Sequence, residues 1–247
     1  MLELLTDPAV WAAFLTLTVL EIVLGVDNVI FISIASAKLP AAQRPRARFI
    51  GLCGALVLRV LLLLSLTWII GLSEPVFSVM DFDVSWRDLI LFGGGLFLLY
   101  KSSTEIFEEV EGGLETAEER IIQSAFARVV VQIMLLDLVF SFDSVLTAVG
   151  IADHVEVMIA AVIVAIIVMM FAATPVANFV EAHPSTKMLA LAFLVMVGMA
   201  LVAEAFHFHV EKGFIYAAMA FSLSVEALNL WRARRLAGAR KAPDAAE

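Results

Sequence analysis

Two short stretches of the chain place the same pattern of acidic and polar residues inside otherwise apolar sequence. The first is LEIVLGVDNVI (Leu20–Ile30) and the second is LDLVFSFDSVL (Leu136–Leu146). Their polar positions align as three pairs: Glu21 with Asp137, Asp27 with Asp143, and Asn28 with Ser144. Carboxylate, amide and hydroxyl oxygens are hard ligands that suit Mg²⁺, Ca²⁺ or Mn²⁺. The paired motifs therefore predict a divalent-cation site formed by these six residues.

Acidic residues in apolar sequence need a neutralising partner. A charge at the centre of a bilayer costs about 2.5–3.5 kcal/mol on insertion scales, and four bare carboxylates cost on the order of 10 kcal/mol. Protons, basic side chains or a bound cation can offset this cost, and Arg59 in the second apolar segment is the natural counter-charge. Two roles for Arg59 are open: a permanent ion pair that locks helices together, or an occupant of the carboxylates when the metal is absent.

Helix geometry adds a condition to the predicted site. On a helix of 3.6 residues per turn, Glu21 and Asn28 share a face, whereas Asp27 lies about 120° away from Glu21. We therefore expect the two helices to break or bend near Gly25 and Ser141, because kinks tend to occur at glycine and serine. Such a break frees backbone carbonyls to act as further ligands. The alternative to an all-oxygen site is a mixed oxygen–nitrogen site that includes His207.

The composition is that of a polytopic membrane protein. Of 247 residues, 62% are hydrophobic and 17% are charged, whereas a soluble domain is about 45–50% apolar and about 25% charged. The run from Val157 to Val180 contains no charged residue, which is long enough to cross a hydrocarbon core about 30 Å thick. Backbone polar groups in lipid must be satisfied within the segment, so each long apolar segment should be a helix.

Several classes of protein are excluded by the same sequence. The net charge of −9 and the lack of a basic patch outside the loops argue against a nucleic-acid partner. Cys53 is the single cysteine, so neither an intrachain disulfide nor a thiolate cluster can form. We find no nucleotide-binding motif and no nucleophile–base constellation. We therefore expect no enzymatic activity, no bound nucleotide and no permanently bound cofactor.

The expected fold is an all-α single transmembrane domain over residues 1–247. Seven hydrophobic segments predict its helices: about 10–36, 49–72, 88–107, 129–150, 156–180, 188–208 and 213–231. The domain divides into a first repeat (10–107), an acidic cytoplasmic loop (108–128), a second repeat (129–208), a seventh helix (213–231) and a basic tail (232–247). The acidic loop is either a solvated linker between the repeats or a cytoplasmic cation sensor.

Basic residues in the loops predict the orientation. Alternate loops and the tail carry Lys38, Arg44, Arg46, Arg48, Arg120, Arg128, Lys187, Arg232, Arg234, Arg235, Arg240 and Lys241. The opposite side has only Arg87 and Lys212. The positive-inside rule then puts the N-terminus outside and the C-terminus in the cytoplasm. The two acidic motifs therefore run in opposite directions, which predicts an inverted repeat of helices 1–3 and 4–6 with helix 7 added. Transporters often use this plan, with the site at the midplane.

Five segments of the chain resemble the TerC family of integral membrane proteins. They are EIVLGVDNVIF (Glu21–Phe31), GGLFLLYKSSTEIFE (Gly94–Glu108), QIMLLDLVFSFDSVLTAVG (Gln132–Gly150), EAHPSTKMLALAFL (Glu181–Leu194) and KGFIYAAMAFSLSVEALN (Lys212–Asn229). The resemblance covers nearly the whole chain. The family's typical HVPKGYIY is HVEKGFIY (His209–Tyr216) here, and these changes lie in an outer loop.

The resemblance implies a seven-helix inverted-repeat protein of the bacterial plasma (inner) membrane, of the type implicated in manganese efflux. By the same resemblance, Glu21, Asp27, Asn28, Asp137, Asp143 and Ser144 are the matching acidic-motif positions. The leading hypothesis is a secondary transporter that exports a divalent cation, with Mn²⁺ favoured over Ca²⁺ and Mg²⁺, by proton antiport. The alternatives are a non-transporting assembly factor or scaffold for membrane proteins, and a proton channel or pH sensor. The expected partners are the metal ion and the lipid bilayer, and association into a homo-oligomer is left open.

Overall fold

The structure, a computed structural model, describes residues 6–65, 75–79, 82–111, 125–149, 154–208 and 210–240. Within the helices, the side chains of Val26, Asp27, 142–144, 146–149 and a few other residues lie outside this description. The described part contains seven helices: α2 (Pro8–Ala37), α3 (Arg44–Leu64), α5 (Trp86–Glu111), α6 (Ala125–Val149), α7 (Val155–Ala182), α8 (Pro184–Ala205) and α9 (Lys212–Arg240).

Each predicted apolar segment corresponds to one of these helices, so the all-α prediction is confirmed at that level. The second segment was predicted to run to residue 72, but α3 ends at Leu64 and residues 66–72 lie outside the description. One element was not expected. Strands β1 (Pro75–Val79) and β2 (Phe82–Ser85) pair antiparallel before α5, where valine and phenylalanine favour extended backbone.

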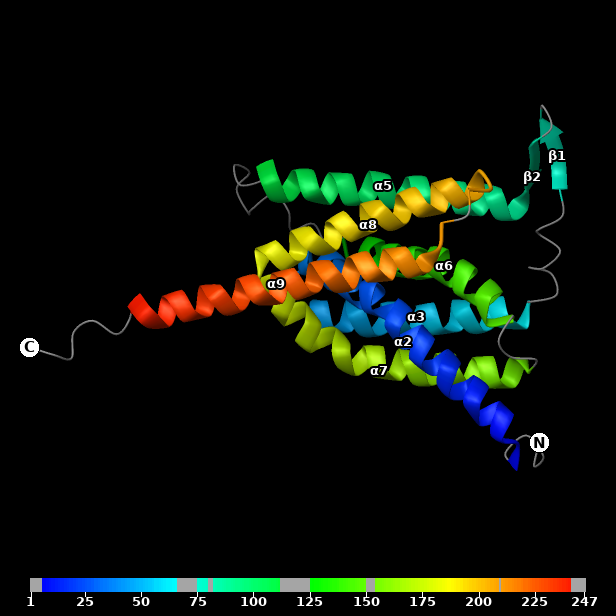
Figure 1. Cartoon of the computed structure of the whole chain (residues 1–247), viewed down its shortest axis with the longest axis horizontal. Coiled ribbons are helices and arrows are strands. Elements are labelled where there is room, and N and C mark those ends of the chain that lie inside the picture. Colours follow the sequence, from blue (N-terminus) through cyan, green and yellow to red (C-terminus); the bar gives the residue numbers. More distant parts are fainter. Residues whose placement is uncertain are drawn as a thin grey trace, which may run out of the picture.

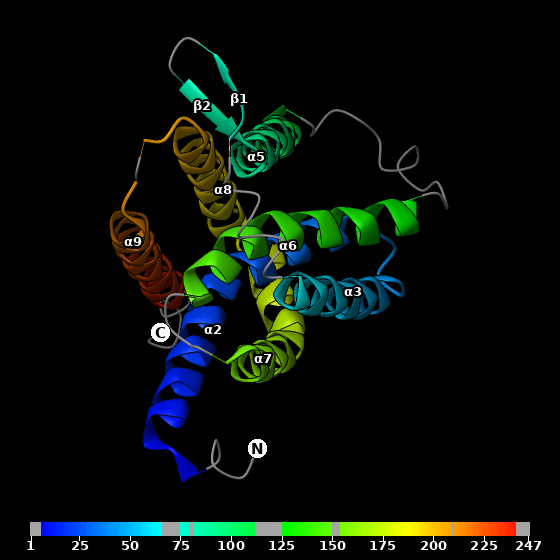
Figure 2. The ribbon, with the colours of Figure 1, turned by 90° about the vertical axis from the view of Figure 1, so that its right-hand side faces the viewer.

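The helices form one elongated bundle with connections at its two ends (Figure 1). The beginning of α2 and the end of α9 lie at opposite ends of the long axis. The most extensive packing joins α2 with α7, α5 with α8, and α3 with α6. In the end view, α6 lies between the α5–α8 pair on one side and α3 and α7 on the other (Figure 2). This arrangement brings α2, α3 and α6 together near the centre of the bundle.

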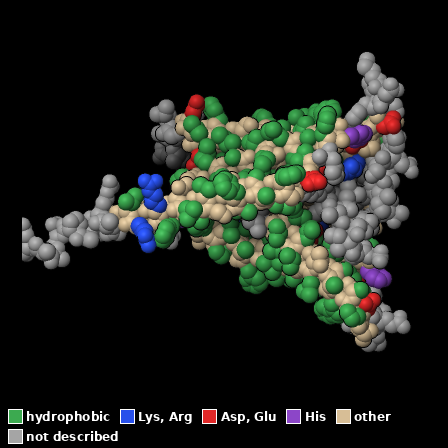
Figure 3. All heavy atoms as spheres, in the orientation of Figure 1, with side chains coloured by type: hydrophobic (Ala, Val, Ile, Leu, Met, Phe, Trp, Pro, Cys, Tyr) green, Lys and Arg blue, Asp and Glu red, His purple; other side chains and the backbone are tan. Residues whose placement is uncertain are grey.

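Five of the seven described helices are long and apolar enough to cross a membrane, namely α2, α3, α7, α8 and α9. The other two, α5 and α6, have 26 and 25 residues and carry several of the buried charges discussed below. Apolar side chains cover the long side of the bundle that faces the viewer in Figure 3, while charged side chains gather toward its ends. This surface suits a lipid environment. Seven spans, the inverted repeat and the orientation remain predictions.

Of the predicted break or bend near Gly25 and Ser141, the break is wrong, because α2 and α6 run as uninterrupted helices through these residues. The bend stays a prediction. A side-chain carbon built on Gly25 would overlap the sulfur of Met169 on α7. Gly25 therefore serves close packing between α2 and α7. The Ser141 hydroxyl donates a hydrogen bond to the Asp137 carboxylate one turn earlier, at 3.0 Å. Ser141 therefore acts through its side chain and leaves the backbone ladder intact.

Small residues also set the distance between α5 and α8. A Cβ on Gly95 would lie 2.7 Å from Cγ2 of Val202 and 2.8 Å from the carbonyl oxygen of Gly198. Gly93 faces open space, and a Cβ added there would meet no described atom within 4 Å. The glycine run before the middle of α5 is therefore explained in part by helix packing, as expected where small residues let helix backbones approach closely.

Candidate functional site

A buried arginine joins the two acidic motifs at the centre of the bundle. Arg59 on α3 is 2% exposed. Its Nη1 donates to Oε2 of Glu21 on α2, and its Nη2 donates to Oδ1 of Asp137 on α6 at 2.9 Å. Its Nε donates to Oγ of Ser141 at 2.8 Å. One guanidinium thus holds the first acidic residue of each motif, and both acids lie near the middle of their helices.

The Asp137 carboxylate accepts hydrogen bonds on both of its oxygens. Oδ1 accepts from Nη2 of Arg59 and also from Nδ2 of Asn28, at 3.3 Å. Oδ2 accepts from Oγ of Ser141 at 3.0 Å. Asp137 is 3% exposed, and a carboxylate at such a position needs these donors, because a buried charge without partners is strongly unfavourable. Three helices therefore converge on one carboxylate.

Asn28 contributes an oxygen that has no partner. Its side chain is buried, and its Nδ2 is directed at Asp137. Its Oδ1 accepts no hydrogen bond from the part of the chain that the structure describes. A buried acceptor left without a donor costs about 1–3 kcal/mol, so such an atom needs an explanation. An amide oxygen beside a carboxylate is a suitable ligand for a hard cation.

The cluster of Glu21, Asp137 and Arg59 is formally negative. Two carboxylates face one guanidinium, which leaves an excess of one negative charge if both acids are ionised. All three side chains are nearly inaccessible to solvent, so solvent screens this charge little. The arrangement therefore attracts a proton or a metal cation. It gives no such advantage to an anion.

Three of the six predicted site residues are brought together: Glu21, Asn28 and Asp137. The other three, Asp27, Asp143 and Ser144, belong to α2 and α6, but their side chains lie outside the described residues. No group of three His, Cys, Asp or Glu side chains among the described residues is arranged to hold a metal ion. The composition of the cation site is therefore still a prediction.

Sequence reasoning identified Arg59 as the counter-charge but missed the contribution of Ser141 to the cluster. The spacing offered a signal, because Ser141 follows Asp137 by one helical turn and must share its face. His207 does not join this cluster. Its Nε2 lies 3.3 Å from Oδ2 of Asp88 at the start of α5, so the mixed site with His207 finds no support.

Other charged residues form ion pairs within and between helices toward the two ends of the bundle. Lys101 pairs with Glu105 at 2.6 Å, as the spacing predicts, and Lys38 reaches the same carboxylate at 2.8 Å. Burial alone would lower the pKa of the Lys38 ammonium, but its bonds to Glu105 and Glu108 outweigh this effect and raise the pKa. At the opposite end, Arg87 pairs with Glu204 at 2.7 Å.

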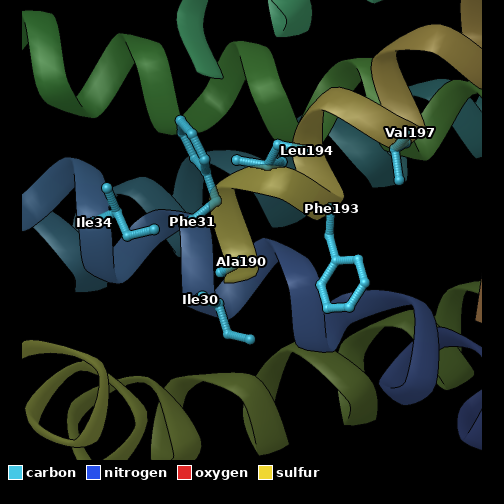
Figure 4. Close-up of a pocket in the computed structure, with 7 residues that line it drawn as sticks. All are labelled: Ile30, Phe31, Ile34, Ala190, Phe193, Leu194 and Val197. Carbon is cyan, nitrogen blue, oxygen red and sulfur yellow. The ribbon is translucent and has the colours of Figure 1, made fainter. Parts of the chain in front are cut away.

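The described hollows of the bundle are mainly apolar. One lies between α2 and α8 and is surrounded only by apolar side chains: Ile30, Phe31, Ile34, Ala190, Phe193, Leu194 and Val197 (Figure 4). It offers no ligand for a cation. Another, between α7, α8 and α9, is lined by Glu226, whose Oε1 already accepts from the hydroxyls of Ser185 and Thr186. Neither competes with the central cluster as a cation site.

Long apolar helices around a buried cluster of acids and one arginine define a polytopic integral membrane protein. Comparison with known families matches residues 6–241 to the integral membrane protein TerC family. The chain belongs to the TerC family, and it is an integral protein of the inner membrane, as its relatives are.

Relatives cover almost the whole chain. The UPF0053 inner membrane protein YgdQ of Escherichia coli K12 is 54% identical over 231 residues, which are 94% of this chain and 97% of YgdQ. A UPF0053 protein of Haemophilus influenzae is 50% identical over 96% of this chain and 99% of its own length. The inner membrane protein YoaE of E. coli K12 is 49% identical over 92% of this chain, which corresponds to 44% of YoaE. No solved structure matches the chain.

Proposed function

We propose that this protein is a secondary transporter that exports a divalent cation, with Mn²⁺ as the substrate. The observation that carries the proposal is the burial of Glu21 and Asp137 around one guanidinium, with one negative charge in excess. Acidic side chains inside membrane helices are costly, and in membrane proteins they mark ion pathways. The chain belongs to the TerC family, which is implicated in manganese efflux. Among the hard cations, this favours Mn²⁺.

In this proposal the ion binds to oxygen atoms from both motifs. The carboxylates of Glu21, Asp27, Asp137 and Asp143 supply charge, while Asn28 and Ser144 complete the ligand set. The unpartnered Oδ1 of Asn28 supports this assignment, because a bound cation would satisfy it. The ion is the transported substrate, so it binds and leaves in each cycle.

Export of a dication needs an energy source, and we propose proton antiport. The membrane potential is worth about 2.3 kcal/mol per charge per 100 mV, and in a negative-inside cell it opposes the exit of Mn²⁺. Protons that enter in exchange return part of the charge and can reset the carboxylates. An imposed pH gradient should therefore change the rate of Mn²⁺ efflux from vesicles. A rate indifferent to that gradient would contradict proton coupling.

A second candidate is a non-transporting scaffold or assembly factor. The observation that favours it is that Arg59 alone binds Glu21, Asp137 and Ser141, and so joins α2, α3 and α6. A buried network of this kind can serve to fix how helices associate. The two candidates differ in one measurable respect, since the scaffold neither binds nor moves Mn²⁺.

The test is Mn²⁺ binding and flux with purified protein in lipid vesicles. We expect Glu21→Gln and Asp137→Asn each to reduce both by about tenfold or more, because each removes a charged ligand. Glu204→Gln is the matched control, since this acid is paired with Arg87 away from the cluster, and it should retain flux. Wild-type protein without Mn²⁺ binding would move the assignment to the scaffold, or to a proton pathway if the vesicles conduct protons.

A further inference from the structure

The structure points to a specific role for Arg59, which rests on the proposed transport function. We propose that Arg59 is a tethered competitor of the transported ion. Its guanidinium occupies the carboxylates in the empty protein, must withdraw before Mn²⁺ binds, and returns as the ion leaves. This role differs from that of a permanent ion pair, which would stay in place throughout the cycle.

The number of acceptor positions on Asp137 limits what can bind to its carboxylate. A carboxylate oxygen offers two lone pairs, and Oδ1 already accepts from Nη2 of Arg59 and Nδ2 of Asn28. A cation can bind this oxygen only if one of the two donors leaves. Oδ2 keeps the bond from Ser141. When Arg59 withdraws, a flip of the Asn28 amide turns its Oδ1 toward Asp137. This oxygen, which has no partner among the described residues, then becomes a second ligand beside the vacated carboxylate oxygen.

The net charge of the cluster depends on which cation occupies it. With Arg59 alone, the cluster of Glu21 and Asp137 carries one negative charge, and with Mn²⁺ alone it is neutral. With both cations it carries one positive charge, and the dication and guanidinium repel each other at close range in a poorly screened interior. The buried position of all three side chains strengthens this repulsion. Within the cluster of Glu21, Asp137 and Arg59, charge therefore favours alternate occupancy over joint occupancy when Asp27 and Asp143 are protonated.

The planar shape of the Arg59 guanidinium also suits this role. Arg59 uses Nη1, Nη2 and Nε on three separate acceptors from two helices, and a planar guanidinium is suited to such multiple contacts. A lysine ammonium is a compact point charge on a flexible stem and cannot span Glu21, Asp137 and Ser141 in the same way. The guanidinium therefore holds Glu21, Asp137 and Ser141 together through a single side chain.

This role predicts a separation of affinity and turnover in variants of Arg59. In Arg59→Lys and Arg59→Ala, we expect the Kd for Mn²⁺ to fall by about tenfold or more, because the apparent Kd of wild type includes the fraction of sites held by the guanidinium. We expect the rate of Mn²⁺ efflux at saturation to fall in the same variants, because nothing displaces the bound ion. Arg87→Gln removes an arginine from the ion pair with Glu204 and should leave both values unchanged.

A chemical probe makes the test independent of general effects on stability. Methylguanidinium added to folded Arg59→Ala should compete with Mn²⁺ and raise its Kd, whereas the same concentration should have little effect on wild type, whose site already holds a guanidinium. Folding is checked by size-exclusion chromatography in detergent, and Arg59→Lys carries the affinity test if Arg59→Ala does not fold.

The outcomes separate the two proposals. Tighter Mn²⁺ binding with slower efflux, and competition by methylguanidinium, support the tethered competitor. Unchanged or weaker Mn²⁺ binding in folded Arg59→Lys, with wild type still active, would overturn it and leave the transport function standing. A wild-type protein that binds no Mn²⁺ would instead overturn the proposed function on which this role depends.

Discussion

At the scale of single residues, the polar groups around Asp137 differ in whether they have hydrogen-bond partners. Its carboxylate accepts bonds from Arg59, Asn28 and Ser141, while the Asn28 oxygen accepts none from the described chain. The cluster thus holds its charges through hydrogen bonds and leaves one buried oxygen without a described donor.

Replacing Asn28 with alanine should weaken Mn²⁺ binding without a matching loss of stability. The variant loses a hydrogen bond to a charged group, worth about 1.5–3 kcal/mol, but it also removes an unpartnered buried acceptor that costs about 1–3 kcal/mol. The two effects largely cancel in the free energy of unfolding, while the affinity should fall by about tenfold through the lost ligand. Binding titrations and thermal unfolding in detergent measure the two quantities.

Asn229→Ala is the matched control for this change, because Asn229 is an exposed amide on α9. It should alter neither quantity. A large loss of stability in Asn28→Ala with unchanged Mn²⁺ affinity would mean that the amide has a structural role and is not a ligand.

Glu105 should contribute far more to stability than Glu109. Its side chain is 4% exposed and is shared by Lys38 and Lys101, so Glu105→Ala removes charge-assisted hydrogen bonds to two partly exposed ammonium groups at a cost of about 1.5–3 kcal/mol. Glu109 and its partner Lys187 are about one-quarter exposed, and solvent reduces the worth of such a pair to about 1 kcal/mol or less. Thermal or denaturant unfolding of Glu105→Ala and Glu109→Ala measures the difference.

The pH dependence of the Glu105 effect follows from Lys38. Its pKa in the folded protein is raised above the ordinary value of 10.5, so its stabilising contribution is complete below the unfolded pKa and is lost only as the pH rises through the folded value. The difference between wild type and Glu105→Ala should therefore be constant between about pH 6 and pH 9. A difference that disappears within that range would show that another group is responsible.

At the scale of helices, the sequence predicts which segments are helical but not how they approach one another. Continuous apolar runs located the seven described helices, because lipid requires each segment to satisfy its own backbone. The expected break at Gly25 was wrong for a reason that lies outside α2, since the overlap with Met169 comes from α7. Geometry within one helix cannot reveal a packing partner, and the same limit hid the contact between Ser141 and Arg59 on α3.

Glycines in α5 provide a test of helix packing with an internal control. Gly95→Ala should destabilise the protein by about 1–3 kcal/mol, the usual cost of overpacking, because the new Cβ meets the backbone oxygen of Gly198. Gly93→Ala faces open space and should be neutral or stabilise by up to about 1 kcal/mol through helix propensity. Unfolding in detergent compares the two variants, and equal effects would contradict the role of Gly95 in packing α5 against α8.

At the scale of the whole molecule, the helix pairs follow a pattern that supports the inverted repeat. If α2, α3 and α5 correspond to α6, α7 and α8, an exchange of the two halves converts the α2–α7 pair into the α6–α3 pair and leaves α5–α8 unchanged. These are the most extensive helix pairs in the bundle. The central arginine has no counterpart in this exchange, because the spacing of the two motifs aligns Arg59 with Pro175. In the predicted repeat the acids therefore come in pairs, while their counter-charge comes from one half.

The charges at the ends of the bundle predict its orientation in the membrane. Lys38, Arg44 and Lys187 form interhelical ion pairs at one end, and the basic residues of α9 extend beyond the same end (Figure 3). The positive-inside rule places this end in the cytoplasm. Single cysteines introduced into a Cys53→Ser background can test it, since Cys53 is the native cysteine.

We expect Glu211→Cys, in the exposed segment just before α9, to react with a membrane-impermeant maleimide in intact cells. Arg232→Cys, exposed near the other end of α9, should react only after the inner membrane is opened, because α9 is long enough to separate the two positions across the bilayer. The reverse labelling pattern would contradict the orientation that the positive-inside rule predicts. Labelling of both positions in intact cells would mean that α9 lies along the membrane surface and does not form the seventh span. The proposal would then rest on the central cluster of α2, α3 and α6.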